Sequence, residues 1–215
     1  MRAREPFSGF SHLVGAILAL IGLPILIRMA LINGDLRHLI AFAIFGVSLV
    51  LLYTGSALYH LLPLSPTGVL ILRRIDHILI FVLIAGTYTP YCLIPLKGPW
   101  GWALLGVVWM ITIGGVLMKL FWIDAPRWLS TLIYIFMGSL ILVALSPLLQ
   151  TLPLGGLVWL IVGGLFYLVG ALVYGLKWPN FIPGRFGFHE IWHLFVLAGS
   201  FSHYWSVLRY VSMVV

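Results

Sequence analysis

Long apolar stretches, separated by short polar connections, dominate this sequence. Seven stretches have the length of roughly 20 mostly apolar residues that crosses a bilayer as a helix. They span residues 11–32, 39–62, 75–96, 100–120, 128–149, 155–176 and 188–211. Hydrophobic residues make up 62% of the 215 positions and charged residues only 8%, against about 25% charged residues in a soluble domain. The pattern predicts an all-α integral membrane protein with seven transmembrane helices.

The rest of the composition indicates how many domains the protein has and excludes several kinds of partner and site. The seven stretches leave room only for short connections and termini, so residues 1–215 are expected to form a single transmembrane domain. The first stretch is longer than the apolar part of a signal peptide and is expected to be retained. The net charge is +7, but the basic residues are scattered singly, which argues against a nucleic-acid partner. The single cysteine, Cys92, excludes an internal disulfide and a cysteine-based metal site.

The distribution of Lys and Arg predicts the orientation, because loops on the cytoplasmic side are enriched in both. The N-terminus and every second loop carry eight of these residues, and the opposite side carries four. The eight are Arg2, Arg4, Arg73, Arg74, Lys119, Arg127, Lys177 and Arg185; the four are Arg28, Arg37, Lys97 and Arg209. This bias predicts a cytoplasmic N-terminus and an external C-terminus.

Ionisable groups are rare within the apolar stretches, and such groups are functional candidates because burying them in a membrane costs energy. His60 ends the second stretch, Asp76 begins the third, and His189 and His193 begin the seventh. The predicted topology brings all four to the cytoplasmic side. His189 and His193 share one helix face because they are four residues apart, and Ser56 precedes His60 by the same spacing.

Three neutral imidazoles can occupy three corners of a zinc tetrahedron and leave the fourth open for water. The sequence therefore predicts a Zn²⁺ site made by His60, His189 and His193. Asp76 would hold the water or act as general base, and Ser56 would hydrogen-bond the water or an adjacent oxyanion.

Simpler interpretations exist for each residue alone. Asp76 could be a helix-start carboxylate, and Ser56 could serve helix packing. The run from His189 to His193 formally matches H-E-x-x-H, but a zincin would need a soluble catalytic domain. His12 either lines the same cavity or lies at the membrane interface. His203 is about 15 Å further along its helix and either serves a second polar site or packs between helices.

The motifs together resemble the hemolysin III / PAQR family, in its bacterial branch. They are residues 56–60 (Ser-Ala-Leu-Tyr-His), Asp76-His77 leading to residues 85–90 (Ala-Gly-Thr-Tyr-Thr-Pro), and residues 189–193 (His-Glu-Ile-Trp-His) with His203 beyond them. The resemblance implies seven helices, a zinc ion near the cytoplasmic leaflet held by His60, His189 and His193, and Asp76 and Ser56 beside it. It also implies location in the bacterial inner membrane and a role in membrane lipid and fluidity homeostasis.

Three functions follow as hypotheses. The first is zinc-dependent hydrolysis of a lipid amide or ester, as ceramidase activity in receptor members of the family implies, with a membrane lipid as substrate or ligand. The second is a non-catalytic membrane sensor or receptor in which zinc is structural. The third is an ion or proton pathway through His12, Asp76 and His203, with a lytic pore as a further option. The sequence names no protein partner.

Overall fold

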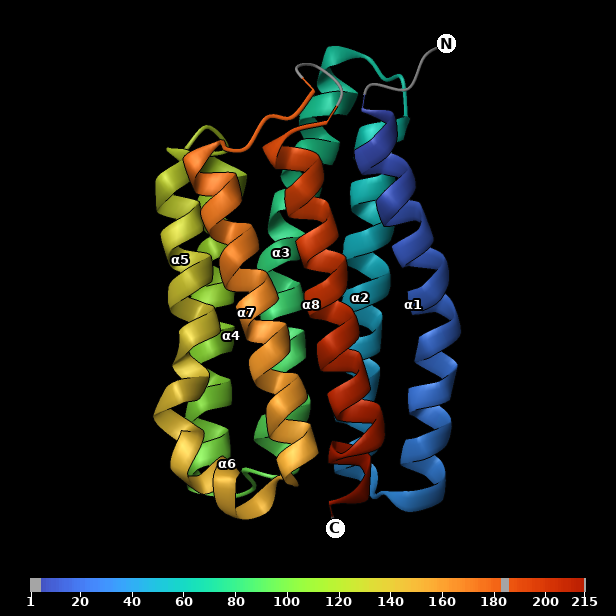
Figure 1. Ribbon diagram of the computed structural model, residues 1–215, viewed down its shortest axis with the longest axis vertical. Helices are drawn as coiled ribbons and strands as arrows, with labels where there is room; N and C mark the ends of the chain where they lie inside the picture. Colours follow the sequence, from blue (N-terminus) through green and yellow to red (C-terminus); the bar gives the residue numbers. More distant parts are fainter. Residues whose placement is uncertain (1–4, 183–185, 215) are drawn as a thin grey trace.

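The described residues, 5–182 and 186–214 of a computed structural model, form an all-α bundle whose helices run along one long axis (Figure 1). The long helices are α1 (Pro6–Asn33), α2 (Leu36–Leu61), α3 (Pro66–Leu93), α4 (Pro99–Phe121), α7 (Leu154–Leu176) and α8 (Phe188–Arg209). A further rod consists of α5 (Arg127–Ser139), the 3-10 segment η1 (Leu140–Ala144) and α6 (Leu145–Thr151), and a short 3-10 turn, η2 (Val211–Met213), ends the chain. The all-α prediction is confirmed.

Local signals in the sequence explain where several helices begin. Proline stands in the first turn of α1, α3 and α4, where its missing N–H costs nothing and its fixed φ suits the helix. Ser65 caps α3 by accepting a hydrogen bond from the backbone N–H of Gly68. This cap starts α3 before position 75, where the apolar stretch was predicted to begin. The apolar count missed that turn because Arg73 and Arg74 interrupt it.

The predicted helix over 128–149 is not continuous. The Tyr88 hydroxyl of α3 donates to the carbonyl oxygens of Met137 and Gly138, at 2.6 and 3.0 Å, and accepts from the backbone N–H of Ile141 at 2.8 Å. A side chain inserted into the hydrogen-bond ladder in this way bends or breaks a helix. Pro147, which has no N–H to donate back to the preceding segment, lies in the first turn of α6, just after the 3-10 segment.

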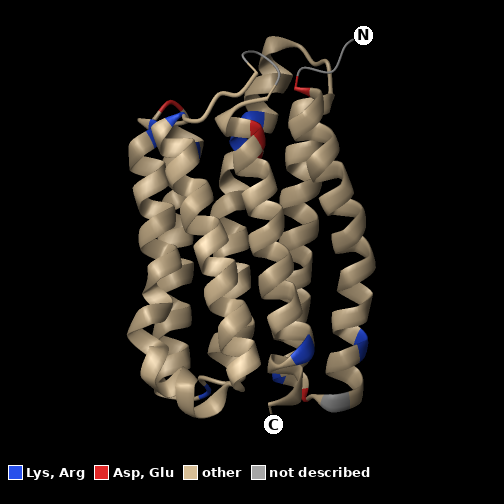
Figure 2. Cartoon of the chain, viewed as in Figure 1, with Lys and Arg blue, Asp and Glu red and all other residues tan. Residues whose placement is uncertain are grey.

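Five of the described helical segments are long and apolar enough to cross a membrane. They are Pro6–Ile32, Leu36–Leu61, Pro99–Phe121, Arg127–Thr151 and Leu154–Leu176. Helices α3 and α8 have similar lengths, 28 and 22 residues, and carry most of the candidate site. In the described chain, charged residues gather towards the two ends of the bundle, with an uncharged band between them (Figure 2). Arg2, Arg4 and Arg185, which the orientation argument included, lie outside the described residues.

The helices close around an interior. Helix α1 packs on α2, α2 on α3, α5 on α7 and α7 on α8, and α8 returns to α1, while α4 packs against α3. Phe42, Phe45 and Phe81 are fully buried between them. Large apolar side chains such as Leu18, Ile113 and Leu165 point outward and are more than half exposed. An outer surface of this kind suits lipid, because burying it in a membrane is favourable.

Candidate metal centre

Three histidines meet at one end of the bundle. His60 lies in the last turn of α2, and His189 and His193 lie in the first two turns of α8. One ring nitrogen from each lies within 4.8 Å of the others. The Nε2 atoms of His189 and His193 are 3.2 Å apart. His60 and His193 are buried, and His189 is partly exposed. The structure thus brings together the three residues predicted as metal ligands.

The start of α8 explains how its two histidines are held. Glu190 accepts a hydrogen bond from the backbone N–H of Gly187 at 2.9 Å and receives a long one from the Ser8 hydroxyl at 3.4 Å. A carboxylate at this position satisfies a backbone donor that the first turn leaves open and complements the helix dipole. Glu190 therefore stabilises the turn that carries His189.

The donor set fits a metal ion. Imidazole nitrogens bind zinc at about 2.0–2.1 Å, which places two ligands of one tetrahedral ion about 3.3 Å apart. The separation of 3.2 Å between the two Nε2 atoms matches that value. Both ring nitrogens of His60 are buried and have no hydrogen-bond partner among the described residues. A buried polar atom of this kind calls for a ligand, so the three histidines could hold a metal ion.

Asp76 and Ser56 line the same cavity as the three histidines. Ser56 is 1% exposed and lies one turn before His60 on α2. Asp76 lies on α3 and is partly exposed. Its neighbour His77, to which the sequence assigned no role, also lines the cavity and has its Nδ1 atom 2.7 Å from the carbonyl oxygen of Arg73. The catalytic roles of Asp76 and Ser56 stay predictions.

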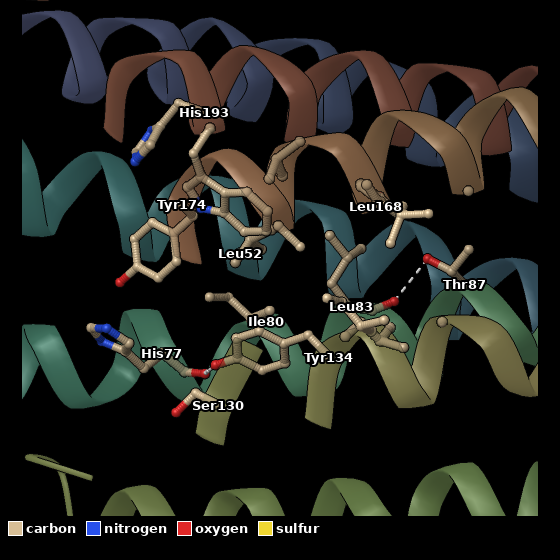
Figure 3. Close-up of a pocket in the computed structure, with 18 of the residues that line it drawn as sticks. Leu52, His77, Ile80, Leu83, Thr87, Ser130, Tyr134, Leu168, Tyr174 and His193 are labelled. Atoms are coloured by element: carbon tan, nitrogen blue, oxygen red, sulfur yellow. Dashed lines mark hydrogen bonds between the residues drawn. The ribbon is translucent and has the colours of Figure 1, made fainter. Parts of the chain in front are cut away.

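The cavity itself has a volume of about 900 Å³ and extends from the histidines into the bundle. Side chains from opposite walls point into it, with His77 and Ser130 of α3 and α5 facing Tyr174 and His193 of α7 and α8 (Figure 3). Beyond them the lining is mainly apolar, with Leu52, Ile80, Leu83, Leu148, Leu160 and Leu168 among its members. A space of this size and lining suits an extended apolar ligand with a polar group at the histidine end.

His12 and His203, for which the sequence allowed two alternatives each, also line this cavity. The ring of His12 lies 3.8 Å from that of His193, and His12 is 3% exposed. Of its two alternatives, lining the cavity is the one the structure shows. His203 is 4% exposed and its ring lies 5.2 Å from that of Tyr167. It faces a deeper part of the cavity than the three-histidine cluster.

Cations also line the cavity that holds the histidine cluster. Lys119 is almost fully buried and donates a hydrogen bond to the Ser130 hydroxyl at 2.7 Å. Arg127 lies over the ring of Tyr174, 4.6 Å from its centroid, a cation–π arrangement. Arg73 pairs with Asp124 at 3.1 Å, close to the surface. These contacts hold positive charge near the end of the cavity where a ligand's polar group would lie.

Glu5 is the residue that the sequence reasoning missed. It precedes α1, and its Oε2 atom lies 2.7 Å from His60 Nδ1 and 3.6 Å from His189 Nε2. No spacing rule links a residue at the start of the chain to a cluster made by α2 and α8. The only available signal was its rarity, since the chain has five Asp and Glu residues in all.

The fold and the site define a multi-pass integral membrane protein with a histidine cluster at one end of an internal cavity. The sequence model described as haemolysin-III related matches residues 1–204, and the chain belongs to that family. Together with the apolar helices, this membership places the protein in the bacterial cell membrane.

Named relatives resemble nearly the whole chain. Hemolysin-3 of Bacillus cereus is 43% identical over 207 residues, which cover 96% of this chain and 91% of that protein. The hemolysin-3 homolog of Bacillus subtilis is 41% identical over 206 residues, 96% of this chain and 93% of that protein. The human monocyte to macrophage differentiation factor is 25% identical over 212 residues, 94% of this chain and 82% of the human protein. The last of these is a PAQR-type relative, so both parts of the resemblance inferred from the motifs are confirmed.

Proposed function

We propose that the protein is a zinc-dependent hydrolase of a lipid amide or ester and that it serves membrane lipid and fluidity homeostasis. One observation carries this proposal: three imidazoles lie at one end of an elongated, mainly apolar cavity inside a membrane protein. A lipid whose chain occupies the cavity would place its polar linkage at the histidines. The basic side chains of Lys119 and Arg127, which line the same cavity, would stabilise negative charge that develops there.

Each residue of the candidate site would have its own role in hydrolysis. His60, His189 and His193 would hold the ion, and zinc, when bound, supplies a Lewis acid that acidifies water and polarises a carbonyl. The Asp76 carboxylate would take the proton that the attacking water loses and return it to the departing nitrogen or oxygen. The Ser56 hydroxyl would donate a hydrogen bond to the negatively charged oxygen formed at the carbonyl carbon. Leu83 and Leu168 would hold the lipid chain away from water.

The orientation belongs to the same proposal. With all seven rods crossing the bilayer, the excess of Lys and Arg places the N-terminus and the histidine cluster on the cytoplasmic side and the C-terminus outside. Arg73, Lys119 and Arg127 line the cavity that holds the histidines, whereas Arg28 lies near the C-terminal end of α1 and Arg209 is the last residue of α8. The substrate would then enter from the inner leaflet.

The test is lipid turnover by the purified protein. A panel of amide and ester lipids is incubated with zinc-loaded protein, with chelated protein and with the Asp76→Asn variant. We expect hydrolysis of at least one lipid class, loss of activity on chelation and its return with zinc. Asp76→Asn should retain zinc and lose about 10²–10⁴-fold in rate, the usual contribution of a general base. Zinc-loaded protein that cleaves nothing across the panel would contradict the proposal.

A non-catalytic sensor with structural zinc is the second candidate, favoured by the origin of the ligands. They come from α2, which packs mainly against α1 and α3, and from α8, which packs mainly against α7. The two helices are joined by side-chain bonds such as that from the Tyr53 hydroxyl to Ser200 Oγ at 2.7 Å. A metal ion would cross-link the two helices. This candidate predicts that His60→Ala lowers thermal stability sharply while Asp76→Asn leaves stability and cellular phenotype unchanged. An Asp76→Asn protein that keeps zinc and loses its phenotype would exclude it.

A further inference from the structure

A buried lysine lies in the wall of the cavity without a carboxylate to balance its charge. Lys119, near the end of α4, is 3% exposed and lines the cavity. Among the described residues its ammonium donates one hydrogen bond, to Ser130 Oγ at 2.7 Å, although an ammonium carries three N–H donors. No carboxylate of the described residues forms an ion pair with it, since Asp124 pairs with Arg73 instead. Burial of an unpaired charge is costly, so this position suits a negative group supplied by a ligand.

A second cation without a carboxylate partner lies beside the first. Arg127 lines the cavity and precedes Ser130 by three residues on α5, and residues three apart are neighbours on a helix surface. Its guanidinium carbon lies 4.6 Å from the centre of the Tyr174 ring and 5.2 Å from that of Phe188. One N–H donates a long bond, 3.5 Å, to the Tyr174 carbonyl oxygen. A guanidinium has five N–H donors, and stacking on aromatic rings leaves its edges able to bind phosphate or carboxylate.

Tyr174 connects these two cations to the histidine cluster. Its ring contacts the guanidinium of Arg127 and also lies 6.0 Å from the ring of His189. On the facing wall of the cavity lies Ser130 (Figure 3), which accepts the hydrogen bond from Lys119. The cations and the histidines therefore border the same part of the cavity, from which the mainly apolar lining extends into the bundle.

We propose that Lys119 and Arg127, with the Ser130 hydroxyl, form a subsite for the phosphate of a lipid headgroup, so that the ligand of the cavity is a phospholipid. The proposal rests on the proposed occupation of the cavity by a lipid, although not on cleavage of that lipid. A charge that develops only during a reaction cannot balance the two cations in the resting complex, whereas a permanent anion can. Of the anions that Lys and Arg bind, phosphate is the one that bilayer lipids carry next to their ester linkages. One headgroup can therefore reach both the cations and the histidines.

The position of Lys119 differs from that of an ordinary basic residue at a membrane surface. Lys177, at the C-terminal cap of α7, is exposed and is not among the residues that line the cavity. A lysine of that kind attracts anionic lipids of the surrounding bilayer. A phosphate that pairs with buried Lys119 has to enter the cavity. The two lysines carry the same charge, so Lys177 provides a matched control for general attraction between a basic protein and anionic lipids.

The experiment measures lipid binding by the full-length protein in a neutral detergent, with ether-linked lipids that cannot be hydrolysed. A fluorescent phosphatidylglycerol is displaced by unlabelled phosphatidylglycerol, by the dialkylglycerol with the same chains, or by inorganic phosphate. Wild type should bind phosphatidylglycerol about 10–100-fold more tightly than dialkylglycerol, as expected of hydrogen bonds between charged groups. Lys119→Gln and Arg127→Gln should each weaken phosphatidylglycerol binding about 10-fold or more and leave dialkylglycerol binding unchanged. Lys177→Gln should bind both lipids as wild type does.

Several results would overturn the phosphate subsite. They are equal affinities of wild type for the two lipids, an unchanged preference in Lys119→Gln and Arg127→Gln, and the same loss in Lys177→Gln. Displacement by inorganic phosphate at the concentrations at which the lipid competes would overturn the lipid source and indicate a free anion. Dialkylglycerol binding reports whether a variant keeps a folded cavity. If Lys119→Gln does not fold, Lys119→Arg, which keeps the charge, should retain the preference while Arg127→Gln loses it.

The outcomes also separate this inference from the proposed function. Phosphatidylglycerol that binds as expected, in a zinc-loaded protein that cleaves no lipid of the panel, would contradict only the hydrolase. Cleavage of an uncharged amide lipid by a protein that shows no preference for phosphatidylglycerol would overturn only the phosphate subsite.

Discussion

At the scale of single residues, Asp35 shows how one side chain starts a helix. Its carboxylate accepts hydrogen bonds from the backbone N–H groups of Arg37 and His38 at 2.9 and 3.2 Å, and its Oδ1 atom lies 2.9 Å from His38 Nδ1. These bonds, that of the His38 side chain first among them, favour the ionised carboxylate and hold the pKa of Asp35 below its ordinary value. The first turn of α2 therefore gains stability from the ionised form.

Asp35→Ala should lower the Tm of the protein at neutral pH, because it removes this cap. Since the pKa is lowered by folding, the stabilisation is complete above the unfolded value of about 3.9 and is lost as the pH falls below it. The Tm difference between wild type and variant, measured in detergent, should therefore shrink in acid. Asp35→Asn, which keeps a capping side chain, serves as the control. Equal Tm values for wild type and Asp35→Ala at neutral pH would contradict this role.

Residues that depend on local spacing could be predicted from the sequence, and those that depend on packing could not. The pairing of His189 with His193 follows from helix geometry, and the approach of His60 follows from the expected direction of each span. The contact of Glu5 with His60 depends on how the start of α1 meets the end of α2. The close contact between the rings of His12 and His193 also depends on the packing of helices that are distant in sequence.

At the scale of helices, the contact between α3 and α4 depends on the absence of a side chain at Gly115. A Cβ atom at this position would overlap the ring of Phe81, which is fully buried. At the adjacent Gly114, a Cβ atom would meet nothing within 4 Å. The two glycines thus form a matched pair on one helix.

Gly115→Ala is expected to destabilise the protein by about 1–3 kcal/mol, the usual cost of overpacking. Gly114→Ala should stay within about 1 kcal/mol of wild type or stabilise it slightly, because alanine favours the helix. Unfolding in a denaturing detergent series measures both. Similar free energies of unfolding for the two variants would show that α3 and α4 do not pack as described.

The helices as elements were largely predictable because apolar runs of membrane length leave few alternatives. The break between α5 and α6 was not, because its main cause lies in another helix. The Tyr88 hydroxyl of α3 takes the place of backbone partners around Met137 and Ile141. The pattern of apolar residues within 128–149 contains no information about a hydroxyl group that belongs to another helix.

At the scale of the whole molecule, the orientation in the membrane determines which side of the bilayer the histidine cluster faces. Cysteines introduced singly at Asn180, near the histidine end, and at Met213, near the C-terminus, can be labelled with a membrane-impermeant thiol reagent. Wild-type Cys92 is buried and provides the background. We expect labelling of Met213→Cys from outside intact cells and of Asn180→Cys only after the cells are opened. The reverse pattern would invert the proposed orientation.

Zinc content measures the central claim most directly. Elemental analysis of the purified wild-type protein should give one zinc ion per chain, and His60→Ala, His189→Ala and His193→Ala should each lose it. His203→Ala, about 15 Å further along α8, should retain the metal and control for general disruption. A wild-type protein without stoichiometric metal, or ligand variants that keep it while remaining folded, would contradict the account.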